Sequence, residues 1–224
     1  MMVTGPGNIF VAAAKRALRG QIGIDSEAGT TEILIVADDT ADARLIAFDL
    51  VSQAEHDEAA ACVLVTHSAD LIRAVQEELA IVVESTENAA RVSAALAGVQ
   101  SALVLVDDLN AAKAFANHYA TEHLELHTAT PMVDAQDISN AGAIFLGANS
   151  PVSLGDYSAG SNHVLPTGQQ AKFGAGLGVH TFLRAQQLID YDESALGEIS
   201  ESIQNFARAE GLPGHADAVR ARFE

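Results

Sequence analysis

The sequence has almost no cysteine. Cys62 is the only one among 224 residues, so no framework of internal disulfides can form. It lies in the apolar run Cys62–Val65, where we expect a buried small hydrophobic residue rather than a reactive thiol. A chain without disulfides suits a reducing compartment, and we predict a cytoplasmic location.

Basic residues are also scarce. Twelve lysines and arginines stand against 30 aspartates and glutamates, which gives a formal net charge of −18. A chain this acidic repels the phosphate backbone of nucleic acids and the anionic surface of a membrane. We therefore expect neither nucleic acid nor a membrane as a partner.

Long hydrophobic runs are missing as well. None approaches the roughly 20 apolar residues that a membrane-spanning helix needs, and Met1–Asn8 has neither the basic nor the apolar region of a signal peptide. Hydrophobic residues make up 49% and charged residues 19% of the chain, which is ordinary for a folded soluble protein and too apolar for disorder. At this length we expect one large domain, or one domain with an appendage.

From residue 33 onward, short apolar runs alternate with amphipathic segments. The runs that predict strands are Ile33–Ala37, Cys62–Thr66, Ala102–Val106, Leu124–Leu126 and Ala143–Leu146. Helical periodicity predicts four helices between them. The first carries Leu45, Ile46, Leu50 and Ala54, and the second is capped by Ser68 and carries Ile72, Val75, Leu79 and Val82. The third covers Ala89–Ala97, and the fourth runs through Phe115 and Tyr119. Continuous apolar strands that alternate with helices indicate an α/β fold with a Rossmann-like, doubly wound parallel sheet.

The two ends of the chain differ from this pattern. A short helix is expected over Asn8–Arg19, and Gly5-x-Gly7 before it resembles part of a dinucleotide loop without the third glycine. In the tail, Leu196, Ile199, Ile203 and Phe206 mark one face of a helix that stops at Gly211, and a second short helix holds Ala218 and Val219. These two helices predict a small C-terminal arm, which has little core of its own and should dock on something such as a second subunit.

The Gly- and Ser-rich stretch Gly155–Pro166 follows the last predicted strand and carries Asp156 and His163. We expect it to be a loop. Open α/β sheets bind their ligands beyond strand ends, which makes this loop a candidate ligand site. The alternative is a solvated loop whose charged residues bind nothing.

Several residue pairs could supply chemistry. Gln53 and His56 are three apart at a predicted helix end, so their side chains can converge. With Asp156 and His215 they would offer two imidazoles, a carboxylate and an amide oxygen to a divalent metal such as zinc. An amide ligand is uncommon and the spacing is not that of a compact zinc motif, so a surface pair remains the alternative.

Glu122 and His123 precede a predicted strand and could act as a general acid–base pair, since histidine titrates near neutrality. The alternative is an exposed pair without a role. Glu210 lies five residues before His215 and could simply face solvent. The remaining histidines show no evident partner, and we interpret them as surface or packing residues: His67, His118, His127 and His180.

Six motifs occur together and in order. They are Gly5–Ile9, Ser52–His56, Glu122–Leu124, Gly155–Tyr157, Asn162–Pro166 and the closing residues Glu210 and His215. The set resembles histidinol dehydrogenase, the NAD-dependent enzyme of the last two steps of histidine biosynthesis. The similarity runs from the first residues to the tail. The alternative hypothesis, a generic α/β ligand-binding module in which these motifs coincide by chance, is therefore remote.

This resemblance implies oxidation of L-histidinol to L-histidine through L-histidinal, with NAD and one zinc ion per subunit. The family's zinc ligands match Gln53, His56, Asp156 and His215. It also implies an intertwined homodimer with exchanged C-terminal arms, in which His215 reaches the zinc of the other subunit.

The resemblance further implies roles for individual residues. His123 would take the alcohol proton, and Glu122 would activate water for the aldehyde step. Asn8 matches a position that contacts NAD. The positions that match substrate contacts are Thr31, Gln53, His56, His123, Asp156, His163, Glu210 and His215.

Some residues depart from the family pattern. Many relatives have serine at the position of Thr31, which keeps the hydroxyl. Ala28–Thr30 stands where an Ala-Gly-Pro sequence is common, and Ala148–Asn149 replaces a pair that usually contains an aromatic residue. Loss of the proline should loosen the loop before Thr31.

The larger departure is length, because the family chain is about twice as long and this sequence begins near its middle. We expect residues 1–30 to be a remnant of a second Rossmann-like domain, 31–185 to carry the zinc and catalytic residues, and 186–224 to form the dimerisation arm. Most of the NAD site would lie in the other half. The chain is then either part of a split enzyme with a separate N-terminal-half polypeptide, or a non-catalytic fragment that binds zinc and substrate.

Overall fold

The computed structural model describes residues 1–5 and 9–224. The chain divides into two compact units, Met1–Phe182 and Leu183–Glu224, and each is described by itself. Asn8, the predicted helix cap and NAD contact, and most of the Gly5–Gly7 motif lie outside the described residues.

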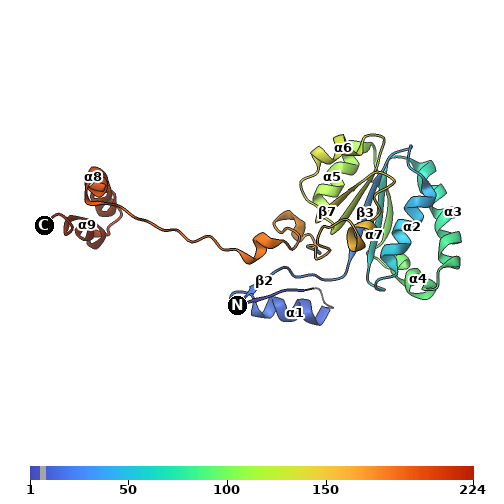
Figure 1. Ribbon diagram of the computed structural model, residues 1–224. Helices are drawn as coiled ribbons and strands as arrows, with labels where there is room; N and C mark the ends of the chain where they lie inside the picture. Colours follow the sequence, from blue (N-terminus) through green and yellow to red (C-terminus); the bar gives the residue numbers. More distant parts are fainter. Residues whose placement is uncertain (6–8) are drawn as a thin grey trace. The chain divides into compact units, whose positions relative to one another are not determined.

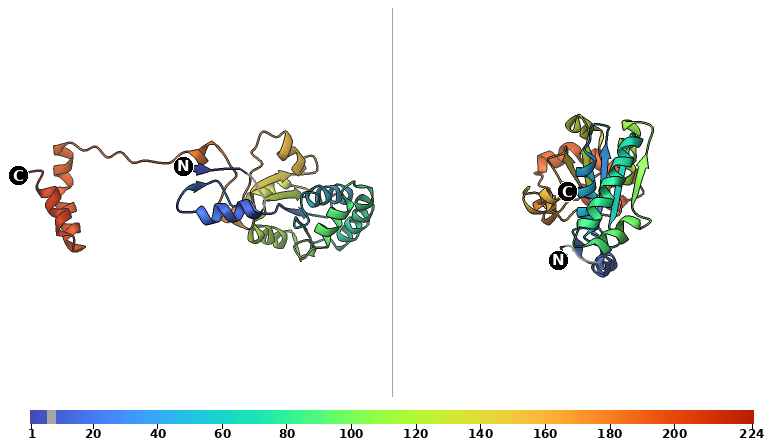
Figure 2. Two further views of the ribbon diagram at one scale, coloured as in Figure 1. Left: turned by 90° about the horizontal axis from the view of Figure 1, so that it is seen from below. Right: turned by 90° about the vertical axis from the view of Figure 1, so that its right-hand side faces the viewer.

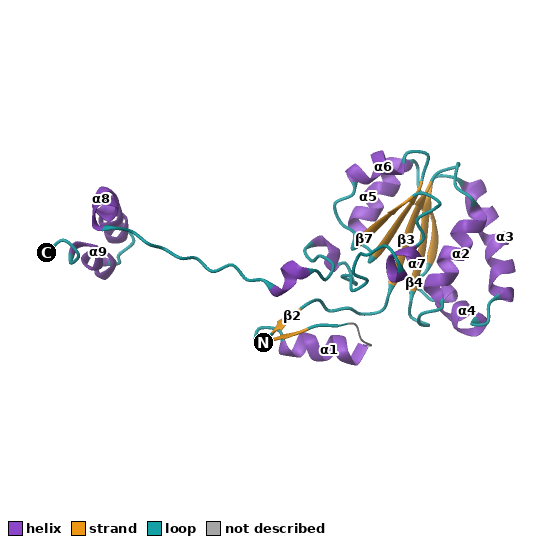
Figure 3. Cartoon of the chain, viewed as in Figure 1, coloured by secondary structure: helices purple, strands orange, loops and turns teal. Residues whose placement is uncertain are grey.

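The first unit is built on a parallel sheet of five strands: β3 (Glu32–Ala37), β4 (Ala61–Thr66), β5 (Ala102–Leu105), β6 (His123–His127) and β7 (Ala143–Leu146). Their order is β5-β4-β3-β6-β7. The chain thus builds the sheet outward from β3 to β5, then returns to the other side of β3 with β6 (Figures 1 and 3). The predicted doubly wound parallel sheet is confirmed.

Helices cover both faces of this sheet (Figure 1). On one face lie α2 (Ala43–Ala54), α3 (Ala69–Ser85) and α4 (Ala89–Ala97), and on the other lies α5 (Leu109–Tyr119). Within β3, Ile33 and Ile35 pack toward α2, whereas Leu34 and Val36 pack toward α5. Because both faces are buried, the strand reads as a continuous apolar run rather than an alternating one.

A separate two-stranded parallel sheet forms at the N-terminus, from β1 (Met2–Val3) and β2 (Gly23–Ile24), with α1 (Ile9–Leu18) between them. It lies apart from the five-stranded sheet and its helical layers (Figure 2). Lys15 on α1 is buried, and its ammonium donates to Asp25 at 2.6 Å. That this segment is a remnant of a second domain stays a prediction.

The stretch after β7 is not the continuous loop expected. Residues Val152–Tyr157 form the short helix α7, which includes Gly155 and Asp156. The residue at the N-cap position is Pro151, whose side chain cannot cap the helix. The buried carboxylate of Glu125 takes that place and accepts a hydrogen bond from the Val152 amide at 3.0 Å. That long-range contact has no local sequence signal.

The remaining elements of the first unit are short. They are α6 (Pro131–Asp134) and 3₁₀ turns over Ala135–Asp137, Gln170–Lys172 and Val179–Phe182. Within the described part of the chain, no helix is long and apolar enough to cross a membrane.

The second unit holds the two predicted arm helices, α8 (Glu193–Ala209) and α9 (Pro213–Arg220). Asp192 caps α8, and Gly211 between the helices adopts a φ of +73°, a conformation that glycine reaches without strain. Ala207 and Ala216 are buried, but most large apolar side chains of this unit are exposed. A two-helix unit of this kind has little core of its own, as expected.

Candidate active site

A cavity of about 460 Å³ lies at the amino ends of the central strands of the first unit. It is lined by Ala28, Gly29, Thr31, His56, Glu122, His123, Asp156, Tyr157, His163, Val164 and Leu165. Thr31 immediately precedes β3, and His123 is the first residue of β6. The site is therefore not at the carboxyl edge of the sheet, where ligands of open α/β sheets usually bind.

Helix direction explains this placement. The helix α2 returns from the carboxyl end of β3 toward the amino end of β4, so Gln53 near its C-terminus reaches the amino edge. The helix α7 starts beside the middle of β6 at Val152 and brings Asp156 to the cavity. Asp156 thus lies in the last turn of a helix and not on a loop.

Glu122 is the central carboxylate of the cavity. Its Oε2 atom accepts hydrogen bonds from the Thr31 hydroxyl at 2.6 Å and from the backbone amide of Glu32 at 3.0 Å. Burial nevertheless raises its pKa to about 7, and the charges of Glu32 and Asp156 act in the same direction. A carboxyl group with this pKa can both give and take a proton near neutral pH.

His123 lies beside Glu122, with its Nδ1 atom 3.6 Å from the Glu122 carboxylate. The same nitrogen lies 3.0 Å from the backbone carbonyl oxygen of Glu32. A carbonyl only accepts, so Nδ1 carries the hydrogen and Nε2 keeps the lone pair in the neutral ring. Burial lowers the pKa of His123, which favours this neutral form, and the ring is equipped to act as a base through Nε2.

Gln53 is 1% exposed, and one of its side-chain polar atoms, a hydrogen-bond acceptor, has no donor among the described residues. Its amide nitrogen donates to the Thr31 hydroxyl at 2.5 Å, but its Oε1 atom is buried and has no hydrogen-bond partner among the described residues. A small cavity of about 50 Å³ is lined by Gln53, His56 and Asp156, among others. A buried, unpartnered oxygen is costly, and a cation held with the neighbouring imidazole and carboxylate would satisfy it.

Comparison with known proteins identifies the family. The family model described as histidinol dehydrogenase matches residues 1–223. The chain belongs to the histidinol dehydrogenase family. Sequence motifs, fold and family match therefore agree.

Among curated histidinol dehydrogenases, the protein of Leifsonia xyli subsp. xyli is 61% identical over 223 residues, and that of Corynebacterium glutamicum is 57% identical. Both alignments cover 100% of this chain but only 51% and 50% of the relatives. A crystal structure of histidinol dehydrogenase from Elizabethkingia anophelis superposes with a TM-score of 0.92 at 33% identity, over 99% of this chain and 51% of that one. The chain thus spans about half the length of the relatives it matches.

Seven of the residues that match histidinol dehydrogenase positions converge in the first unit. Thr31, Gln53, His56, Glu122, His123, Asp156 and His163 all line one or both of the two cavities. Glu210 and His215 are exposed residues of the second unit, at the end of α8 and in α9. Their part in the site, like the role of each residue, stays a prediction.

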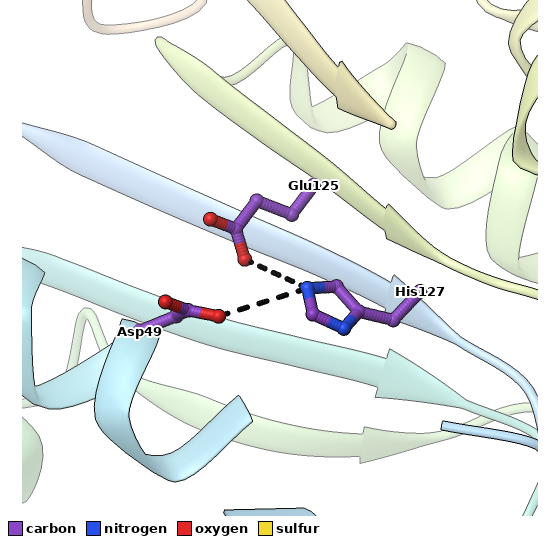
Figure 4. Close-up of side chains that lie close together, drawn as sticks. All are labelled: Asp49, Glu125 and His127. Carbon is purple, nitrogen blue, oxygen red and sulfur yellow. Dashed lines mark hydrogen bonds and ion pairs between the residues drawn. The ribbon is translucent and has the colours of Figure 1, made fainter. Parts of the chain in front are cut away.

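Sequence reasoning missed two groups. Glu32 was not singled out, yet its backbone atoms hold both Glu122 and His123, and burial raises the pKa of its own carboxyl. His127 is buried, as a packing residue would be, but the expectation that it has no evident partner is wrong, because it lies between Glu125 and Asp49 (Figure 4). The signal was present: polar residues at 123, 125 and 127 share one face of a strand.

The other histidines agree with their interpretation, since His118 and His180 are exposed and His67 is half-buried. Cys62 is buried, as expected, and burial raises the pKa of its thiol to about 12.

Proposed function

We propose that this chain carries the zinc and catalytic residues of an NAD-dependent histidinol dehydrogenase, which oxidises L-histidinol to L-histidine through L-histidinal. Family membership and one structural observation support this. The unpartnered Gln53 Oε1, His56 and Asp156 line a cavity next to the buried Glu122–His123 pair.

The donor set fits zinc. Gln53, His56 and Asp156 supply an amide oxygen, an imidazole nitrogen and a carboxylate oxygen, and His215 would complete the set from an exchanged arm. A bound zinc ion would orient the imidazole and amino groups of the substrate. The hydrogen bond from Gln53 to Thr31, and from Thr31 to Glu122, links this ligand to the catalytic carboxyl.

In the first oxidation, His123 Nε2 accepts the hydroxyl proton of the alcohol, while the carbon gives up a hydride. NAD, when bound, is the hydride acceptor in both oxidations. The backbone carbonyl of Glu32 holds the Nδ1–H, so the ring keeps its orientation as it becomes protonated. Thr31 and His163 lie where they can contact the substrate.

In the second oxidation, Glu122 removes a proton from water, and the oxygen adds to the aldehyde carbon. The resulting hydrate loses a second hydride and a proton to give the acid. A pKa of about 7 suits Glu122 to this task, because the group is partly ionised at neutral pH and can return the proton. We expect Glu122→Ala to impair oxidation of the aldehyde more than oxidation of the alcohol; a variant equally slow in both steps would contradict this role.

A second candidate function is zinc and substrate binding without catalysis. The specific observation in its favour is coverage, since the chain matches only about half of each relative. Asn8, the position matched to an NAD contact, lies outside the described residues. In this case catalysis would need a separate polypeptide that corresponds to the other half.

The deciding experiment measures NADH formation from L-histidinol and NAD by the zinc-loaded chain, alone and mixed with the remaining half of the Leifsonia xyli relative. Metal content and solution mass are determined on the same samples. We expect bound zinc, little or no turnover by the chain alone, and turnover in the mixture. Turnover by the chain alone would show that it holds NAD unaided, and a chain that binds no zinc would refute the metal assignment.

A further inference from the structure

A second polar cluster lies on β6, away from the catalytic pair. Asp49 on α2, Glu125 and His127 bring their charged atoms together in the interior (Figure 4). The His127 Nε2 atom lies 3.1 Å from Glu125 Oε2 and 3.7 Å from Asp49 Oδ2. None of these three residues is part of the lining of the cavities of the proposed active site. The proposed mechanism therefore assigns them no role.

Glu125 is the centre of this cluster. It is 0% exposed, and each of its carboxylate oxygens has a partner. Oε1 accepts the backbone N–H of Val152 at 3.0 Å, and Oε2 pairs with His127. The carboxylate therefore connects β6 directly to the start of α7, and through His127 to α2.

Both helices that the cluster touches carry proposed zinc ligands. Asp49 lies one turn before Gln53 on α2, and Val152 lies one turn before Asp156 on α7. Each helix is thus held to β6 near the middle of the sheet and presents its ligand at the amino edge. Gln53 and Asp156 line the same cavity only if the two helices keep this relation.

The helix α7 needs such an anchor. It has six residues, too few to be stable by its own hydrogen bonds. A buried carboxylate at its first amide replaces the missing cap and complements the positive end of the helix. The helix also packs into the core: Val152 is buried there, and a Cβ on Gly155 would approach the Phe145 ring to 2.7 Å, so a larger residue would force that ring to shift.

The charges of the cluster agree with a structural network. Burial and the neighbouring Glu125 charge raise the pKa of Asp49 to about 7. Burial acts to lower the pKa of His127, but the hydrogen bond and charge of Glu125 outweigh it and raise that pKa. The raised pKa values favour a proton on Asp49 and on His127, which strengthens the pairing of the imidazole with the carboxylates around it.

We propose that Glu125, His127 and Asp49 are positioning residues that fix α2 and α7 on β6, so that Gln53 and Asp156 meet at one metal site. The identity of that metal site rests on the proposed function; the positioning itself rests on the contacts above.

The test compares three variants of the full chain. Glu125→Met keeps the side-chain volume but removes both hydrogen bonds. Glu125→Gln keeps an acceptor for the Val152 amide and can donate to His127, so it serves as the rescue. Leu126→Ala is the matched control, because Leu126 is equally buried on the same strand but packs on the opposite face of the sheet, toward α5.

Three measurements are made where each variant is folded: zinc affinity by chelator competition, the absorption spectrum of bound Co²⁺, and hydrogen exchange of residues 152–157. For Glu125→Met we expect zinc affinity to fall roughly ten-fold or more, the Co²⁺ spectrum to change, and exchange in α7 to accelerate. Glu125→Gln should stay near wild type. Leu126→Ala should lower the melting temperature but leave affinity and α7 exchange unchanged.

Unchanged affinity and unchanged α7 exchange in Glu125→Met would overturn the proposal. Equal loss of affinity in Glu125→Met and Leu126→Ala would also overturn it, by showing only general destabilisation. A second metal equivalent in the wild type that Glu125→Met loses would show a cation site instead.

If the wild type binds no metal, the zinc assignment fails, and α7 exchange alone then decides the positioning proposal. If Glu125→Met does not fold, Asp49→Ala gives the same comparison from the α2 side, where the side chain is only half-buried.

Discussion

At the scale of single residues, the site is governed by two buried groups that fit poorly without a ligand. Glu122 is a carboxyl that burial keeps partly protonated at neutral pH, and Gln53 holds an oxygen without a partner among the described residues. Both features cost folding free energy in the free chain. Substitution of each residue should therefore change the unfolding free energy or the metal affinity in a characteristic way.

For Glu122 the signature is a pH dependence of stability. Its pKa rises from 4.5 to about 7 on folding, so between these values the unfolded chain loses a proton that the folded chain keeps, and stability falls as pH rises. Glu122→Gln resembles the protonated acid and removes this loss. We expect equal stability below pH 4.5 and a gain on the order of 3 kcal/mol above pH 7, measured by urea unfolding at both pH values. A gain of the same size at low pH would contradict the assignment.

For Gln53 the signature is a contrast between stability and metal binding. Gln53→Met removes the unpartnered oxygen but also the hydrogen bond to Thr31, so we expect the unfolding free energy of the metal-free chain to change by no more than about 1 kcal/mol. Zinc affinity should fall roughly ten-fold or more, as measured by isothermal titration. Gln170→Met is the control, because Gln170 donates to Glu27 away from the site and its loss should leave zinc affinity unchanged.

At the scale of elements, backbone packing sets where the proposed catalytic pair, Glu122 and His123, lies. Gly142 precedes β7, and its amide donates to Thr121 while the next amide donates to the carbonyl of Glu122. A Cβ on Gly142 would lie 2.6 Å from that carbonyl oxygen. Because the neighbour is backbone, it cannot move aside without displacing Glu122 itself.

We therefore expect Gly142→Ala to destabilise the first unit by about 2 kcal/mol and to lower turnover of the assembled enzyme. Chemical unfolding and NADH formation measure the two effects. Gly214→Ala is the control: it lies in α9, and apart from its chain neighbours and its own helix backbone no described atom is within 4 Å of its added Cβ. It should be neutral or slightly stabilising, and a comparable loss at both positions would refute the packing argument.

The elements themselves were largely predictable from sequence. Strands such as Ala143–Leu146 and the helix Ala89–Ala97 agree at both ends, because apolar runs and local caps carry their signals within a few residues. The helix α7 was missed, since its anchor is Glu125, far away in sequence. For the same reason Asp156 was expected on a loop beyond a strand end, although α7 brings it to the amino edge beside Glu122 and His123. The path of that helix depends on tertiary packing.

At the scale of the whole molecule, the second unit has apolar surface that its own helices do not cover. Phe206 is 68% exposed, and Leu188 and Ile189 are exposed still more. Surfaces of this kind are usually covered by a partner, which agrees with the proposed homodimer. Sequence could indicate the two helices by periodicity, but not what they contact.

We expect the chain to self-associate, and Phe206→Ser to shift the balance toward monomer by roughly ten-fold in dissociation constant, as measured by sedimentation velocity. Val99→Ser is the control, since Val99 is 106% exposed but lies in the first unit, just after α4. A monomeric wild type, or equal effects of both substitutions, would contradict the dimer.

The direction of α2 and α7 has one further consequence. Both helices bring their C-terminal ends toward the cavity, and these ends carry the partial negative charge of the aligned peptide dipoles. Together with the Asp156 carboxylate, they make the metal-free cavity a negative electrostatic field that attracts cations and amines.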